Sequence, residues 1–167
     1  MAKITAVADI FNTAIALEKK AGAFYAALSD KFSNYPEVSE FWKDMMNDEG
    51  QHARFLQKAL DSLSEEQRLR HVDGSVANYS DEELQMYLSL CDPQGIKTLD
   101  DAYEIAYKLE SSEINSKVKS LLKEFIKSDQ MIYFILSVLD KHVSKLETFE
   151  KSFGDAEFMR NLPVKPG

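Results

Sequence analysis

The segment MMNDEGQH, residues 45–52, carries the pattern that decides how this chain folds. It places a carboxylate, Glu49, and an imidazole, His52, within a stripe of apolar residues spaced three and four apart. Residues at this spacing share one face of a helix, so both side chains point toward whatever the stripe packs against. A buried carboxylate needs a compensating charge, and a divalent metal is the obvious candidate. The apolar members of the stripe are Val38, Trp42, Met45, Leu56, Ala59 and Leu63.

The composition is that of a single globular domain rich in helix. The chain has 167 residues, of which 44% are hydrophobic and 29% charged, with only six glycines and four prolines. The net charge of −8 argues against a nucleic acid or an anionic membrane as partner. No apolar run approaches the ~20 residues of a membrane span, and no secretory signal is recognisable. One cysteine, Cys91, excludes an internal disulfide, so a cytoplasmic location is expected.

Heptad seams predict a first helical hairpin. One helix is expected over about residues 4–32, with Glu18 on its apolar seam and Tyr25 as a core tyrosine whose hydroxyl meets a carboxylate. Pro36 is placed to open the second helix, which is expected to end near Ser62. Reflection about position 34 or 35 brings Glu18 level with Glu49 and His52.

The segment from about 64 to 97 predicts a long crossover between the two hairpins. It contains turn residues, and the segment that begins at Ser80 resembles a capping box opening a short helix through Leu90. His71 is expected to face solvent. A connection of this length can run from one end of a bundle to the other.

A second hairpin is expected to repeat the first. Its first helix opens at about residue 98 and carries Glu110 on the inner seam, followed by either Glu113 or Ile114. A break near residues 127–129 starts the last helix, which carries His142 and extends to about residue 153. Reflection about this break brings Glu110 level with Leu139 and His142, so Leu139 stands where the repeat predicts a glutamate. Residues 1–153 therefore form the predicted bundle, and 154–167 a short tail.

Three segments together resemble the rubrerythrin-like branch of the ferritin-like superfamily: residues 16–25 (ALEKKAGAFY), residues 48–56 (DEGQHARFL) and residues 102–110 (AYEIAYKLE). The resemblance covers about residues 4–153. It implies an all-α, antiparallel four-helix bundle with one long crossover between the second and third helices. It also implies a di-iron centre that uses oxygen, peroxide or ferrous iron. The implied metal ligands are Glu18, Glu49, His52, Glu110 and His142, with Glu113 as an additional carboxylate.

Two departures from the family pattern bear on activity. The family's fourth helix carries Glu-x-x-His, whereas this chain has Leu139 three residues before His142. Full rubrerythrins also have a rubredoxin-like four-cysteine iron centre, which a chain with one cysteine cannot form, so an external protein would have to donate electrons. Iron is expected either as a pair or in a partially occupied site, with manganese or zinc as alternatives.

Three functions remain open from the sequence. The first is a metal-dependent oxidoreductase, a rubrerythrin-like peroxidase or ferroxidase. The second is a metal-binding bundle with little turnover, because Leu139 leaves one metal position short of a ligand. The third is a metal-free helical bundle with a structural or interaction role. A homodimer is expected in each case, since such bundles often leave an apolar face to pair.

Overall fold

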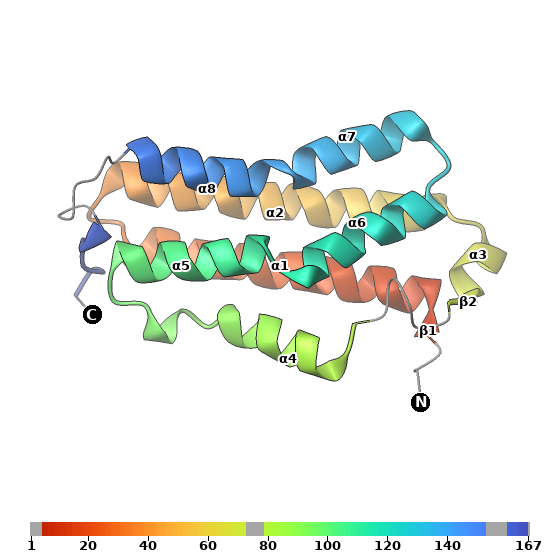
Figure 1. Ribbon diagram of the computed structural model, residues 1–167, viewed down its shortest axis with the longest axis horizontal. Coiled ribbons are helices and arrows are strands. Elements are labelled where there is room, and N and C mark those ends of the chain that lie inside the picture. Colours follow the sequence, from red (N-terminus) through yellow and green to blue (C-terminus); the bar gives the residue numbers. More distant parts are fainter. Residues whose placement is uncertain (1–4, 73–78, 153–159, 167) are drawn as a thin grey trace.

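The computed structural model describes residues 5–72, 79–152 and 160–166, without the side chains of Met131, Val138 and Leu139. It is an all-helical bundle, as predicted (Figure 1). The first hairpin consists of α1 (Val7–Lys31) and α2 (Pro36–Ser62), which lie side by side. The second hairpin consists of two broken helices, formed by α5 (Leu99–Glu110) with α6 (Glu113–Phe125), and by α7 (Asp129–Leu139) with α8 (Lys141–Ser152).

The crossover between the hairpins contains short elements. These are α3 (Glu65–Leu69), β2 (His71–Val72), α4 (Asp81–Leu90) and the 3-10 turn η1 (Pro93–Gly95). Helix α4 lies along the outside of the bundle (Figure 1). His71 is exposed, as predicted, and β2 pairs antiparallel with β1 (Thr5–Ala6), which the sequence did not predict.

Local sequence signals account for the helix starts. Pro36 occupies the first turn of α2, where its missing N–H would have no helical partner. Ser80 and Thr98 form the capping boxes of α4 and α5, in which each side chain accepts a hydrogen bond from the backbone N–H three residues later. A lost cap of this kind typically costs about 1 kcal/mol.

The structure corrects the prediction that each helix of the second hairpin is continuous. The first break, at Ser111 and Ser112, separates α5 from α6. There the Asn115 side chain donates hydrogen bonds to the carbonyls of Leu109 and Glu110, which compensates for the interrupted helical ladder. The second break, at Asp140, separates α7 from α8, and the exposed Asp140 carboxylate pairs with Lys119 of α6. The predicted break between α6 and α7 is present at residues 126–128.

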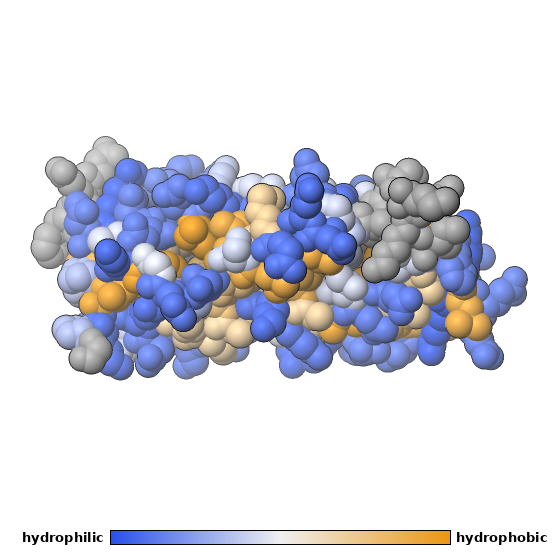
Figure 2. Space-filling view, turned by 90° about the horizontal axis from the view of Figure 1, so that it is seen from below, coloured by the Kyte–Doolittle hydropathy of each residue, from blue (hydrophilic) through white to orange (hydrophobic). Residues whose placement is uncertain are grey.

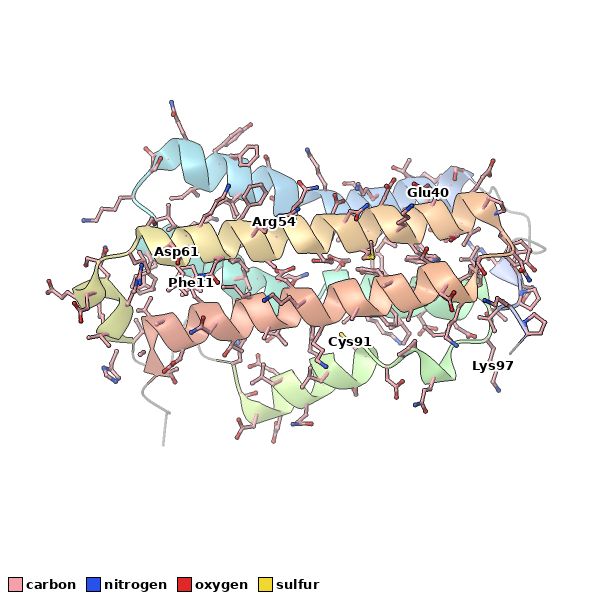
Figure 3. The ribbon with its side chains drawn as sticks, turned by 180° about the vertical axis from the view of Figure 1, so that it is seen from behind. Phe11, Glu40, Arg54, Asp61, Cys91 and Lys97 are labelled. Carbon is pink, nitrogen blue, oxygen red and sulfur yellow. The ribbon has the colours of Figure 1, made fainter. Side chains whose placement is uncertain are left out.

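Two apolar clusters form the core, one toward each end of the bundle. One contains Tyr25 and Trp42, whose rings stack at 5.9 Å between centroids, and the other contains Phe11 and Leu56. Each fully buried large side chain stabilises the fold by about 1.5–3 kcal/mol. Phe11 is seen from the opposite side of the bundle in Figure 3. Between the clusters, the chain buries polar residues at the middle of α1 and α2 and at the start of α8.

The described part of the tail, residues 160–166, packs on the bundle. Leu162 is buried, its carbonyl accepts a hydrogen bond from the Leu99 N–H, and Pro163 bridges to Thr98. The other residues of the predicted tail, 154–159 and 167, lie outside the described residues. So do Ile4 and Phe153, which the sequence placed in the predicted helices. Among the residues described, no helix combines the length and the apolar character needed to cross a membrane.

Candidate metal centre

Five side chains from both hairpins meet in the middle of the bundle. Glu18 comes from α1, Glu49 and His52 from α2, Glu110 from the end of α5 and His142 from the start of α8. At most 8% of each of these side chains is exposed. The structure therefore brings together the five residues that the sequence placed at one height.

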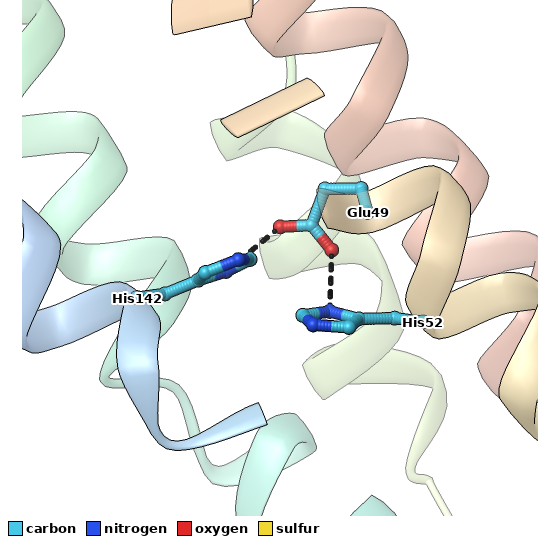
Figure 4. A group of neighbouring side chains, drawn as sticks. All are labelled: Glu49, His52 and His142. Carbon is cyan, nitrogen blue, oxygen red and sulfur yellow. Dashed lines mark hydrogen bonds and ion pairs between the residues drawn. The ribbon is translucent and has the colours of Figure 1, made fainter. Parts of the chain in front are cut away.

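The geometry divides the five residues into two halves that share Glu49. On one side, His52 Nδ1 lies 3.4 Å from a Glu18 oxygen and 3.2 Å from Glu49 Oε2. On the other side, His142 Nδ1 lies 3.2 Å from Glu49 Oε1 and 3.0 Å from a Glu110 oxygen. Figure 4 shows the Glu49 carboxylate between the two imidazoles, whose ring centroids are 4.6 Å apart. Each half thus has one imidazole, one carboxylate of its own and one oxygen of the shared carboxylate.

The local electrostatics show how strongly the cluster attracts positive charge. Burial, followed by the neighbouring Glu49 carboxylate, raises the pKa of Glu18 to about 8. Burial would lower the pKa of His52, but hydrogen bonds to Glu18 and Glu49 outweigh it and raise that pKa to about 9. Burial and Glu110 would raise the pKa of Glu49, but hydrogen bonds from both histidines hold it below its usual value. In the metal-free protein, bound protons therefore supply the positive charge that the carboxylates require.

His142 is held from its other side by residues that the sequence analysis did not single out. Its Nε2 lies 3.4 Å from an Asp48 oxygen, and Asp48 in turn accepts a hydrogen bond from Lys145. Asp48, Glu110 and Glu49 outweigh the effect of burial and raise the pKa of His142 to about 12. Burial would raise the pKa of Asp48, but His142 and Lys145 lower it to about 2. The three-residue spacing of His142 and Lys145 was the signal that could have revealed this arrangement.

Two tyrosines border the cluster. The Tyr25 hydroxyl donates a hydrogen bond to Glu110 at 2.5 Å, which confirms the prediction that it meets a carboxylate. Tyr87, from the crossover helix α4, lines a cavity of about 10 Å³ together with Glu18, Glu49, His52 and Glu110. Nothing in the sequence of the crossover identified Tyr87 as a neighbour of the cluster.

The donor set fits a transition metal. Among the described residues, Glu49, His52 and His142 can each offer one ligand atom, all within 4.8 Å of one another. The buried Nε2 of His52 has no hydrogen-bond partner, and the Nε2 of His142 faces Asp48 at 3.4 Å without a hydrogen bond, so the Nδ1 atoms of both rings face the carboxylates of the cluster. Neutral imidazoles and carboxylates at a fixed height of a bundle suit iron, manganese and zinc.

Two other residues of the predicted site stand apart from these five. Glu113 is exposed in the first turn of α6, where Ile114 takes the inward position, so the structure does not bring Glu113 to the cluster. The Leu139 side chain lies outside the described residues, and the prediction that it replaces a carboxylate stays a prediction. The break at Asp140 separates Leu139 from His142. The sequence had predicted a continuous helix through both residues.

We expect the metal-free protein to lose stability as the pH rises from about 6.5 to about 9. Glu18, His52 and His142 have folded-state pKa values above their ordinary values, so the folded protein holds protons that the unfolded chain has released. Each such proton contributes a slope of up to about 1.4 kcal/mol per pH unit, stabilising at low pH and lost at high pH. Urea unfolding in the presence of a chelator measures this slope, and a stability that rises over this range contradicts the prediction.

The bundle and its buried carboxylate–histidine cluster define the ferritin-like class of helical proteins. The sequence model of the family described as Rubrerythrin matches residues 9–131, more than half of the chain, and the chain belongs to this family. Comparisons with curated proteins and with solved structures found no match. The matched range includes Glu18, Glu49, His52 and Glu110 and ends before His142. Family membership implies iron binding, and the cluster is a possible site for it.

Proposed function

We propose that this protein binds a pair of iron ions in the cluster and uses them to reduce hydrogen peroxide. The observation that carries the proposal is the two-sided arrangement around Glu49. Glu18 and His52 would hold one ion, Glu110 and His142 the other, and the Glu49 carboxylate, which contacts both histidines, would serve both ions. A two-metal centre requires two similar half-sites that share a carboxylate. A cluster of ion pairs with a purely structural role would not require its two halves to be similar.

The bound iron pair would supply two electrons, one from each ferrous ion, while two protons complete the conversion of peroxide into two waters. The protein's own residues hold these protons and position the ligands. Glu18, with its raised pKa, is protonated at neutral pH in the metal-free protein, and the Tyr25 hydroxyl already donates a hydrogen bond to Glu110. Asp48 and Lys145 fix the orientation of the His142 ring, as residues behind metal-binding histidines commonly do.

Oxygen and ferrous iron, as alternative physiological substrates, would react at the same cluster. The experiment must therefore distinguish the reaction with peroxide from the reactions with these two substrates. We propose that an external protein returns the two electrons, because the single cysteine of this sequence cannot form a four-cysteine iron centre. We also propose that the protein acts as a homodimer, since exposed Tyr133 and Phe134 give α7 an apolar outer face.

Anaerobic titration with ferrous iron, followed by peroxide, tests the proposed function. We expect two irons per chain, oxidation of both by one peroxide, and the near-ultraviolet absorption band of a ferric pair. Glu113→Gln serves as a control for the wild type. It changes an exposed glutamate outside the cluster, so it should leave the number of irons bound per chain unchanged.

Other outcomes of this titration identify the competing functions. One tightly bound iron without the spectrum of a pair indicates a metal-binding bundle with an incomplete site, the consequence expected if Leu139 removes an essential ligand. Absence of iron, manganese and zinc binding indicates a structural or interaction role and overturns the proposal.

A further inference from the structure

A surface groove lies directly outside the polar cavity of the cluster. It has a volume of about 480 Å³ and runs between α4 and the junction of α5 and α6. Figure 2 views the face that carries α4 and shows apolar residues interspersed among hydrophilic ones across its middle. The apolar part of the groove lining consists of Met86, Tyr87, Leu90, Tyr107 and Ile114.

Tyr87 is the residue that the groove and the cavity have in common. It lines the groove on one side and the cavity on the other. The cavity is also lined by the four cluster residues Glu18, Glu49, His52 and Glu110 and by Asn115, Val118 and Lys119 of α6. Within α4, all of which the structure describes, Tyr87 alone is buried, with 5% of its surface exposed. The Tyr87 side chain is therefore the part of the cavity wall that the surface groove shares.

The helix that carries Tyr87 is attached to the outside of the four-helix bundle. Besides Tyr87, α4 is held by the ion pair of Glu83 with Lys117 of α6 and by the partly buried Leu84 and Leu90, which pack on the core. Tyr87 is itself a buried member of the apolar cluster that contains Tyr25 and Trp42, so rotation of its ring shifts neighbours in that cluster. Motions of this kind open many enzyme sites on the microsecond to millisecond timescale.

The dimensions and chemistry of the two spaces select what can pass. The inner cavity has room for about one water-sized molecule, so a molecule of two heavy atoms needs a small displacement of the cavity wall and a larger molecule needs a large one. An ion would lose its hydration at the apolar side of the wall, whereas a small neutral molecule would not. Ser112, at the junction of α5 and α6, lines the groove and has a buried hydroxyl without a hydrogen-bond partner, which a polar molecule in transit can engage.

We propose that Tyr87 is a specificity-determining gate, which admits small neutral molecules of the size of hydrogen peroxide from the groove to the cluster and excludes larger ones. The identity of the molecule rests on the proposed function, whereas the gate itself rests on the shared position of Tyr87 between groove and cavity.

Chemical modification of the metal-free protein tests the gate without relying on any activity. Diethyl pyrocarbonate is larger than the inner cavity and modifies histidines, and mass spectrometry reports the rate separately for each of them. In the wild type, cavity-lining His52 should react far more slowly than the exposed His71, because Tyr87 covers it and because its raised pKa leaves little of the unprotonated imidazole that reacts; all variants are therefore compared at the same pH. In Tyr87→Ala the His52 rate should rise about tenfold or more, equivalent to removing about 1.4 kcal/mol of barrier, while the His71 rate stays unchanged.

Three further variants keep the test interpretable. Tyr87→Phe retains the ring and should change the His52 rate by less than about threefold, and Tyr87→Leu should give an intermediate rise if Tyr87→Ala does not fold. Leu28→Ala removes a fully buried side chain that lines neither space, so it controls for general loosening of the core. The proposal is overturned if His52 reacts as fast as His71 in the wild type, if neither Tyr87→Ala nor Tyr87→Leu raises the His52 rate, or if Leu28→Ala raises it equally.

A second measurement addresses the molecule that passes. With the iron-loaded protein, the rates of reaction with hydrogen peroxide and with bulky cumene hydroperoxide are compared. Tyr87→Ala should raise the rate with cumene hydroperoxide about tenfold while changing the rate with hydrogen peroxide less than about threefold. A gate seen by histidine modification without any peroxide reaction refutes the proposed function and leaves the gate intact, and an unchanged preference between the two peroxides refutes size selection by Tyr87.

Discussion

Glu49→Gln should lower the affinity for iron or manganese by about a hundredfold or more, the largest effect expected of any single change in the cluster. Among the described residues, Glu49 alone forms ion pairs with both histidines, with oxygens 3.2 Å from each Nδ1. The amide keeps the shape of the side chain but removes the charge, and its NH₂ group cannot act as the second bridging ligand. Chelator competition under anaerobic conditions measures the affinity.

The same variant should also destabilise the metal-free protein at neutral pH, by about 3 kcal/mol. Two imidazoles with raised pKa values would lose the carboxylate that they share. Breaking a buried ion pair typically costs about 3–5 kcal/mol. Urea unfolding measures this loss. Glu40→Gln changes an exposed glutamate of the same helix, at a site seen in Figure 3, and should alter neither quantity. Wild-type metal affinity in Glu49→Gln would show that Glu49 is not a ligand.

Leu139→Glu should tighten binding of the second metal ion by about tenfold or more and raise turnover with peroxide or with ferrous iron. The substitution creates the Glu-x-x-His pattern that the resemblance implies at positions 139 to 142 and that this chain lacks. The new carboxylate would supply an anionic oxygen to the metals beside Glu49 and Glu110. Metal titration and the absorption band of the ferric pair measure the gain.

The gain in metal binding should come with a loss of stability in the metal-free protein near neutral pH. Like charges about 4 Å apart repel by about 4 kcal/mol at an effective dielectric constant near 20, which sets the upper limit of the loss. Leu139→Gln is the matched control, because it introduces a polar side chain of the same length without the charge. If Leu139→Glu and Leu139→Gln bind metal equally, the break at Asp140 has turned position 139 away from the cluster, and the family pattern does not transfer to this helix.

Much of the first hairpin could be predicted from local patterns. Heptad spacing placed Glu18, Glu49 and His52 on inward faces, and Pro36 marked the start of α2. These predictions succeeded because the spacing of three and four residues fixes which side chains share a face of any regular helix. The length of the turn then fixes which positions of two antiparallel helices lie at the same height.

The second hairpin was predicted less well, for a physical reason that involves particular residues. The seam through Glu110 and Ile114 is continuous in the sequence, yet the structure breaks the helix between them and compensates through Asn115. Periodicity cannot detect such a break, since the apolar face continues in register across it. The same seam offered Glu113 or Ile114 as the inward residue, and packing against the rest of the bundle selected Ile114.

The sequence by itself determined the helical class of the protein, the extent of the first hairpin and the residue types that face its core. Only the tertiary structure decided which atoms meet: Tyr25 with Glu110, 85 positions apart, and Asp48 with Lys145, 97 positions apart. It also placed Tyr87 of the crossover between the surface groove and the cluster. Positions on one helix are related by its fixed geometry, whereas contacts between distant segments depend on how whole helices pack, which no local spacing encodes.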